Sequence, residues 1–389
     1  MTLKVSARGR IPPFIVMDVM QAAAARKQAG EAVYHLEVGQ PGTPAPAAVL
    51  EAAGRALVEE RLGYTVSRGV PDLGAAIARR YQSYNGVEVD PARVVVTTGS
   101  SGGFLLSFLA AFDEGDRVAM ALPGYPCYRN ILSALGIEPV LLLAEPEHRF
   151  QPTPGLLEEA RRESGPIDGL ILASPSNPTG TMIDPEALRE LWAYCQAHGI
   201  RLISDEIYHG ITYEGKATTA LALGDDAIVI NSFSKYFSMT GWRLGWMVVP
   251  EDLLRAVECL AQNFFISPPT LSQLAAVSAF DSIEELDRNV ARYAANRRLL
   301  LDELPRAGFD RLAPVDGAFY IYADVREMTG DSVAFASALL EDTGVAATPG
   351  VDFDPIRGRH FMRFSFSEST GMISEAAAAL VEWNRRRTR

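Results

Sequence analysis

The stretch SFSKYFSMTGWRLG occupies residues 232–245 and follows directly on an apolar run that is typical of a buried strand. Lys235 therefore lies just past a strand end, near Ser232, Ser234 and Arg243. A lysine amine is a nucleophile toward aldehydes, and a cationic or desolvated setting lowers its pKa so that the amine is available. The serines and the arginine suit a dianionic phosphate, which a guanidinium binds with two hydrogen bonds. Taken alone, a lysine at a strand end is more often a solvated surface charge.

Short apolar runs of the same kind recur along the chain, separated by segments with a helical pattern. They predict strands at 34–38, 94–98, 118–122, 140–143, 169–173, 201–204 and 227–231, and an alanine-rich helix at 16–30. Buried strands that alternate with helices indicate a mainly parallel sheet with helices on both faces. We therefore expect an α/β fold built around such a sheet.

The pattern changes after about residue 280, where a long charged helix is expected at 283–304. Strands at 317–321 and 360–366 and a helix at 375–387, with Ser374 as its N-cap, indicate a smaller α+β unit. At 389 residues, the chain also exceeds what one hydrophobic core usually supports. We predict an N-terminal arm with part of the small domain at 1–45, a large domain at 46–280 and a small domain at 281–389.

Composition narrows the class of protein. The chain is 48% hydrophobic and 22% charged, as expected for a globular protein, and its net charge of −12 disfavours nucleic-acid and anionic membrane partners. Its three cysteines and five histidines show no metal-ligand spacing, which predicts free thiols and no metal centre. No apolar run is long enough to span a bilayer, and the N-terminus lacks the features of a signal peptide. These features predict a cytoplasmic protein.

Polar clusters fall where the predicted strands end. In sheets of this kind ligands bind at the carboxyl ends of the strands, so Ser100, Ser101, Asn177, Asp205 and Lys235 are expected to form one site. The glycine-rich connection around the two serines offers backbone N–H groups and a helix dipole to an anion. It matches neither a dinucleotide fingerprint nor a Walker loop, which disfavours a nucleotide-binding dehydrogenase.

The side chains of Asp205 and Asn177 each suit a specific contact with an aromatic ring that contains nitrogen and carries a hydroxyl group. A carboxylate such as Asp205, in ISDEIY, can keep a pyridine nitrogen protonated and so make the ring an electron sink, while Tyr208 donates to the ring's phenolic oxygen. Asn177 lies between two prolines, which fix the direction of its side chain as a hydrogen bond to the phenolic oxygen would need. The alternatives are an aspartate that caps the following helix and an ordinary Asn-Pro turn.

Three segments together resemble the class I and II aminotransferases. They are SNPTG at 176–180, SDEIY at 204–208 and SFSK…GWRLG at 232–245, and they occur in the order and at the spacing of that family. The resemblance covers nearly the whole chain. It implies the fold of the pyridoxal 5′-phosphate (PLP) transferases, with PLP as the cofactor. It also implies an enzyme that moves an amino group between an L-amino acid and a 2-oxo acid.

The resemblance implies roles for individual residues. Lys235 would hold the cofactor as a Schiff base and shuttle the proton, Asp205 would pair with the ring nitrogen, and Asn177 and Tyr208 would contact the ring oxygen. The phosphate would be bound by Ser100, Ser101, Gly102, Ser232, Ser234 and Arg243. Tyr125 matches the aromatic residue that stacks on the ring, although a plain core tyrosine is the alternative.

The substrate residues follow in the same way. Arg363, alone in the apolar stretch HFMRFS, matches the arginine that clamps the substrate carboxylate, and an inward arginine is costly unless it meets a carboxylate. Gly39 and Asn177 would also approach the substrate. Tyr64 resembles a tyrosine that reaches the phosphate of the partner subunit, so the resemblance implies a homodimer with shared active sites.

The sequence restricts the substrate less than the cofactor. Some aspartate-directed relatives carry a lysine just after the phosphate-loop serines, where this chain has Gly103 and Phe104, and residues 11–15 of the arm favour a neutral or aromatic side chain. An arm packed on the domain surface would have the same pattern. Asp354 stands where relatives often have glycine, and no function attaches to it. A PLP-dependent C–S β-lyase and a non-catalytic aminotransferase-like binding protein remain as alternatives, although the complete set of cofactor residues disfavours the second.

Overall fold

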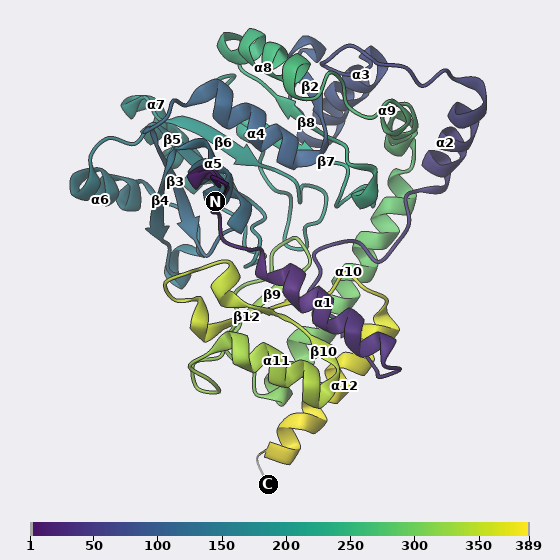
Figure 1. Ribbon diagram of the computed structural model, residues 1–389, viewed down its shortest axis with the longest axis vertical. Coiled ribbons are helices and arrows are strands. Elements are labelled where there is room, and N and C mark those ends of the chain that lie inside the picture. Colours follow the sequence, from purple (N-terminus) through teal and green to yellow (C-terminus); the bar gives the residue numbers. More distant parts are fainter. Residues whose placement is uncertain (1–2, 388–389) are drawn as a thin grey trace.

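The computed structural model describes residues 3–387 (Figure 1). Its centre is a seven-stranded sheet in the order β2-β8-β7-β6-β5-β3-β4. The strands are β2 (Val94–Thr97), β3 (Arg117–Leu122), β4 (Glu138–Leu143), β5 (Gly169–Ala173), β6 (Arg201–Asp205), β7 (Ile228–Ser232) and β8 (Gly245–Val248). All of them run parallel except β8, which is antiparallel to both of its neighbours. The predicted fold class is confirmed, whereas β8 was missed because it is short and begins with a glycine.

Helices cover both faces of this sheet, as the continuous apolar strands require. One face packs against α4 (Gly99–Ala111), α5 (Pro126–Leu135) and α8 (Glu251–Phe264). The other face packs against α3 (Pro71–Arg80), α6 (Pro154–Ser164) and α7 (Pro185–His198), while α9 (Thr270–Ala276) packs on α3 and α2 (Ala47–Glu59) packs on α9. Strand β7 shows how the alternation works, since Ile228 and Ile230 join the first core and Val229 joins the second.

A smaller unit follows the sheet in sequence. The long helix α10 (Ile283–Glu303) leads into an antiparallel sheet of β11 (Thr348–Pro349), β12 (Phe361–Ser365) and β9 (Tyr320–Asp324). Helices α11 (Ser332–Thr343) and α12 (Thr370–Arg387) complete it. The proposed boundary near residue 280 falls in a short turn at Val277–Asp281, immediately before α10, and the division into domains stays a prediction.

The N-terminal segment lies against this smaller unit. Strand β1 (Tyr34–His35) pairs in parallel with β10 (Val345–Ala346), and α1 (Ile15–Gln28) packs against β10 and β11. Figure 1 shows α1 lying across the C-terminal elements, far from α2 in space although near it in sequence. Residues more than 300 positions apart are therefore neighbours, so the N-terminal segment can contribute to a site with C-terminal residues.

Short helical turns connect the longer elements. They are η1 (Ala7–Gly9), η2 (Tyr81–Asn85), η3 (Pro91–Arg93), η4 (Pro146–His148), η5 (Ala220–Ala222), η6 (Thr240–Trp242), η7 (Val277–Asp281), η8 (Pro305–Ala307), η9 (Gly350–Asp352) and η10 (Gly358–His360). Within the described part of the chain, no helix is both long and apolar enough to cross a membrane.

Several predicted boundaries move. The terminal helix begins at Thr370, so Ser374 lies inside it and the N-cap prediction was wrong; Ser369 precedes the helix, and its hydroxyl accepts from the Met372 N–H at 3.3 Å. Both Ser369 and Ser374 are residues that helix N-caps prefer, but the helix begins before Ser374 because Ile373 is buried in the core as part of it. The strand expected at 317–321 also starts later, at Tyr320, because Ala318 adopts a positive φ.

Candidate active site

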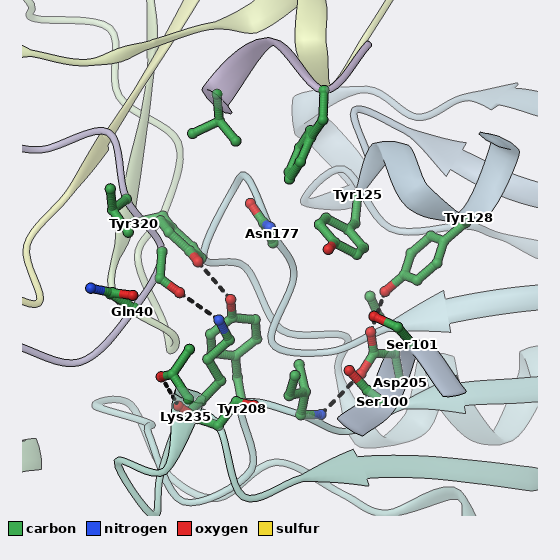
Figure 2. A pocket seen from close by; sticks show the side chains of 18 of the residues that line it. Gln40, Ser100, Ser101, Tyr125, Tyr128, Asn177, Asp205, Tyr208, Lys235 and Tyr320 are labelled. Carbon is green, nitrogen blue, oxygen red and sulfur yellow. Dashed lines mark hydrogen bonds between the residues drawn. The ribbon is translucent and has the colours of Figure 1, made fainter. Parts of the chain in front are cut away.

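A cavity of about 280 Å³ opens at the carboxyl ends of the parallel strands, between the large sheet, the β9–β12 sheet and α1. Eleven of the fourteen predicted site residues line it: Gly39, Ser100, Ser101, Tyr125, Asn177, Asp205, Tyr208, Ser234, Lys235, Arg243 and Arg363. Figure 2 shows the Lys235 amine and the Tyr208 hydroxyl pointing into one region, with Asp205, Ser100 and Ser101 grouped on another side. Segments that the sequence separates widely thus meet at one place.

Lys235 follows β7 in a tight turn that directs its amine into the cavity. Its Nζ donates a hydrogen bond to the backbone oxygen of Gly39 and lies 5.9 Å from the centre of the Tyr208 ring. Burial lowers the pKa of the Lys235 amine to about 8, and the positive charges of Arg363 and Arg243 act in the same direction. The neutral, nucleophilic form is therefore present near physiological pH.

Asp205 ends β6 and is buried. The Tyr128 hydroxyl donates to its Oδ2 atom, and the Ile207 N–H donates to Oδ1 at 3.0 Å. Burial raises the pKa of the Asp205 carboxyl to about 6, although both hydrogen bonds oppose this change. A cation placed in the cavity would favour the charged carboxylate, so the residue suits a protonated ring nitrogen. Tyr128 was not predicted; its only signal is its position one helical turn after Tyr125.

Tyrosine and amide groups surround the middle of the cavity. The hydroxyls of Tyr208 and Tyr320 lie 2.6 Å apart, and the Asn177 Oδ1 atom accepts from Arg363 at 2.8 Å, which leaves the Asn177 amide N–H groups to donate. Tyr320 was missed because a tyrosine in an apolar strand reads as core. The Tyr320 hydroxyl fills the space that a side chain at position 39 would need, since a Cβ atom on Gly39 would lie 2.0 Å from this hydroxyl.

Arg363 is only 2% exposed and is held on several sides. Besides Asn177, its guanidinium donates to the Glu37 backbone oxygen and to the Thr348 hydroxyl, and it lies 4.4 Å from the centre of the Tyr320 ring. Its buried Nε has no hydrogen-bond partner among the described residues. A buried donor without a partner is costly, so this cation suits an anionic acceptor such as a substrate carboxylate.

The first turn of α4 forms an anion cradle. The predicted loop at 99–103 is itself the start of this helix, so Ser100 and Ser101 lie beside its unpaired N–H groups. Arg243 crosses over Gly99, where a Cβ atom would lie 2.5 Å from Nη2. Because Gly99 lacks a side chain, the guanidinium and the helix N-terminus can act on the same anion.

Three predicted residues do not line the cavity. Gly102 packs against the Thr98 side chain. The Ser232 hydroxyl donates to the Leu244 backbone oxygen at 3.1 Å and lies 2.9 Å from the Ser234 hydroxyl, so it contacts Ser234 without lining the cavity. Tyr64 is 83% exposed in the segment between α2 and α3, and a role toward a partner subunit stays a prediction.

These groups fit PLP one by one. The cavity offers an amine for the aldehyde, a buried carboxylate for the ring nitrogen, donors for the ring oxygen and a cradle for the phosphate. The sequence model described as "Aminotransferase class I and II" matches residues 31–380. The chain belongs to the class I and II aminotransferase family. This aminotransferase therefore depends on PLP and moves an amino group between an amino acid and a 2-oxo acid, which sets aside the dehydrogenase and the non-catalytic alternatives.

Individual relatives support this assignment over the full length of the chain. The valine–pyruvate aminotransferase of Mycobacterium tuberculosis is 55% identical over 98% of this chain and 99% of the relative. The (5-formylfuran-3-yl)methyl phosphate transaminase of Methanocaldococcus jannaschii is 34% identical over 95% and 96%. Among solved structures, an aminotransferase from Mycobacterium tuberculosis has a TM-score of 0.96 at 54% identity, covering 99% of this chain and 100% of that one. The aspartate aminotransferase of Thermus thermophilus with maleate has a TM-score of 0.90 at 30% identity, covering 98% and 100%.

One wall of the aminotransferase cavity is apolar and comes from the N-terminal segment. Phe14, Val16, Met17 and Met20 line it, and the Phe14 ring meets Tyr125 edge-on, with the ring centres 5.9 Å apart. We call these four residues the α1 wall. The prediction that the arm lines the pocket holds for Phe14, whereas Ile11 is 47% exposed outside the cavity. The rest of the wall was missed because α1 reads as an ordinary surface helix.

Proposed function

We propose that this aminotransferase acts on an amino acid with a neutral, apolar side chain, with L-valine as the first candidate and pyruvate as the amino acceptor. The α1 wall carries the proposal, because it gives a substrate side chain apolar atoms to contact. The high identity to a valine–pyruvate aminotransferase supports the same choice. Aromatic amino acids are the neighbouring class to test.

The charges that line the cavity argue against an acidic side chain. They are the three cations Lys235, Arg243 and Arg363 and the single anion Asp205. Lys235 joins the cofactor, Arg243 faces the phosphate cradle, and Arg363 offers the α-carboxylate the donors that have no protein partner, among them its Nε–H. A second substrate carboxylate would therefore enter the cavity without a cation of its own from this chain. Leaving a buried charge unpaired costs on the order of 3–5 kcal/mol.

We assign the cofactor residues as follows. Bound PLP supplies an aldehyde that links to an amine and a ring that withdraws electrons. Asp205 would hold a proton at the ring nitrogen, and its buried position would strengthen that contact. Tyr125 would stack on the ring, while Asn177 and Tyr208 would donate to its phenolic oxygen. Phosphate binding falls to Ser100, Ser101, Ser234, Arg243 and the α4 N-terminus, with Gly102 and Ser232 in supporting positions.

Two residues act on the substrate itself. Arg363 binds the α-carboxylate through its open Nε–H and its neighbouring N–H groups. Asn177 and Gly39 line the cavity around this carboxylate position. Lys235 Nζ moves the proton at the substrate α-carbon, which its lowered pKa allows near neutral pH. Because the Gly39 backbone oxygen accepts from this amine, it holds Nζ beside the carboxylate clamp.

The proposed assembly is a homodimer in the cytoplasm. Tyr64 lies among exposed apolar side chains, with Leu57, Val58 and Val66 each at least 60% exposed, and an apolar patch of this kind is typical of a protein interface. We propose that Tyr64 reaches the phosphate cradle of the partner subunit. Sedimentation velocity tests the assembly: a dimer supports the proposal, and a stable monomer that retains full activity contradicts it.

A half-reaction panel tests the substrate. The holoenzyme is mixed with L-valine, L-alanine, L-phenylalanine or L-aspartate, and cofactor absorbance gives kcat/KM for each; pyruvate then reverses the change. We expect valine to exceed aspartate by at least about 100-fold, as an unpaired charge in the cavity requires. Aspartate as the best donor would overturn the proposal. Release of pyruvate and ammonia from a cysteine S-conjugate, faster than any transamination, would instead establish the β-lyase alternative.

A further inference from the structure

Helix α1 begins without a cap of its own. The residue in the N-cap position is Phe14, whose side chain offers no hydrogen-bond acceptor. The first N–H groups of an α-helix have no partner within the helix, and side chains such as aspartate usually satisfy them. A helix that starts on an aromatic residue therefore frays unless another part of the chain caps it.

Asp352 provides that cap from the opposite end of the sequence. Its Oδ1 accepts from the Ile15 N–H at 3.1 Å, and its Oδ2 accepts from the Val16 N–H at 3.2 Å. The side chain is buried, and a carboxylate at this position also interacts favourably with the helix dipole. The contact joins residues 336 and 337 positions apart, so local sequence signals cannot indicate it.

The segment that carries Asp352 is itself fixed against the active site. Arg129 of α5 donates to the Asp352 backbone oxygen at 2.7 Å, and the Gly124 N–H donates to the Phe353 backbone oxygen at 3.1 Å. The Phe353 ring lies 4.7 Å from the Arg363 guanidinium. The cap is therefore held in a defined position relative to both Tyr125, next to Gly124, and the proposed carboxylate clamp.

The capped turn carries the start of the α1 wall. Val16 donates to Asp352 and also lines the cavity, and Phe14 and Met17 flank it. We propose that Asp352 is a positioning residue for substrate selection, which holds the α1 wall at the distance from the clamp that an apolar side chain needs. This inference rests on the proposed function, because it assumes that the wall contacts the substrate side chain.

The test compares two substitutions in the full-length holoenzyme. Asp352→Asn keeps the shape of the side chain but removes its negative charge and replaces one of the two acceptor oxygens with an NH2 group. Asp354→Asn is the control, because Asp354 is equally buried in the same segment but its partners lie away from α1. It accepts from the backbone N–H groups of Ile356 at 2.9 Å and Arg357 at 2.8 Å and pairs with the Arg357 guanidinium at 2.9 Å. The readout is the ratio of kcat/KM for valine to kcat/KM for alanine, since alanine has too short a side chain to use the wall.

We expect Asp352→Asn to lower this ratio about 5- to 10-fold, mainly through the KM for valine, with the spectrum of bound cofactor unchanged. Asp354→Asn should leave the ratio within about twofold of wild type. A general loss of folded enzyme lowers both substrates equally and leaves the ratio untouched. An unchanged ratio in Asp352→Asn, with a wild-type enzyme that does prefer valine, overturns the inference.

Hydrogen exchange of the wild-type holoenzyme tests the contact even if Asp352→Asn does not fold. Protection of the Ile15 and Val16 amides comparable to that of buried Ala23 supports the cap, and free exchange at both overturns it. A wild-type preference for aspartate with those amides protected would contradict the proposed function and leave the cap itself in place. The two failures are therefore distinguishable.

Discussion

The lowered pKa of Lys235 leads to a quantitative prediction for the apoenzyme. With a pKa of about 8, about 9% of the amine is neutral at pH 7 and about 90% at pH 9, whereas an ordinary lysine with a pKa of 10.5 is about 0.03% and 3% neutral. Capture of PLP requires the neutral amine. Its rate should therefore rise about tenfold from pH 7 to pH 9 and then level off, instead of rising about 100-fold and continuing upward.

The assay mixes apoenzyme with PLP at a series of pH values and follows the absorbance change by stopped flow. Reduction with borohydride and mass spectrometry then locate the adduct at position 235. The rate of Nα-acetyl-lysine in the same pH series, divided by the neutral fraction of its own amine, corrects for the ionisations of PLP itself. A corrected rate that climbs without a plateau through pH 10 would refute the reasoning, because it would show that Lys235 titrates as a solvated side chain.

The cause of the shift can be tested by the same measurement. Burial contributes most, and the charge of Arg363 comes next. Arg363→Gln removes that charge and should move the inflection to higher pH, whereas Arg363→Lys retains a cation and should move it less. An inflection that is identical in all three proteins would contradict the effect assigned to the Arg363 charge.

Three further predictions concern single contacts in the site. Asp205→Asn should reduce kcat by at least about 100-fold while the borohydride-trapped adduct still forms, because an amide cannot hold a proton at the ring nitrogen; equal kcat would contradict this role. In steady-state assays, Arg363→Lys should raise the KM for the amino acid by about 10- to 150-fold, since one charge-assisted hydrogen bond is worth about 1.5–3 kcal/mol, and an unchanged KM would show that the clamp lies elsewhere. Gly39→Ala should lower the melting temperature and activity, because its Cβ would lie 2.0 Å from the Tyr320 hydroxyl, and adding Tyr320→Phe should restore part of both if that clash is the cause.

The predicted site residues that meet in the cavity are mostly those with a signal in their own segment. Asp205, Lys235 and Asn177 each follow an apolar strand and carry polar neighbours, and the sheet brings these strand ends together at one edge. Local pattern was sufficient here because parallel strands place their carboxyl ends side by side. The same logic predicted the order of most elements, from the large sheet to the terminal helix.

The differences between expectation and structure come from pairings that join distant segments. The Ser232 hydroxyl, expected at the phosphate, does not line the cavity, because β8 pairs antiparallel with β7, places Gly245 opposite Ser232 and brings the Leu244 carbonyl to the hydroxyl. Since β8 was missed, the sequence could not indicate this contact. Tyr320 was overlooked for a related reason, since its contacts with Tyr208, 112 residues away, and with Gly39 and Arg363 distinguish it from a core tyrosine.

The segment at 36–39 shows why the site depends on such pairings. The Leu36 carbonyl accepts from the Ser365 N–H, next to the clamp, and the Glu37 carbonyl accepts from both Arg363 and Thr348. Two residues later, the Gly39 carbonyl accepts from the Lys235 amine. One short stretch of backbone therefore holds the proposed carboxylate clamp and the proposed reactive amine, which arise from different sheets. Because three residues of backbone span at most about 11 Å, their separation is limited by this stretch as well as by how the two sheets pack. A shift of residues 36–39 would move substrate and cofactor contacts together.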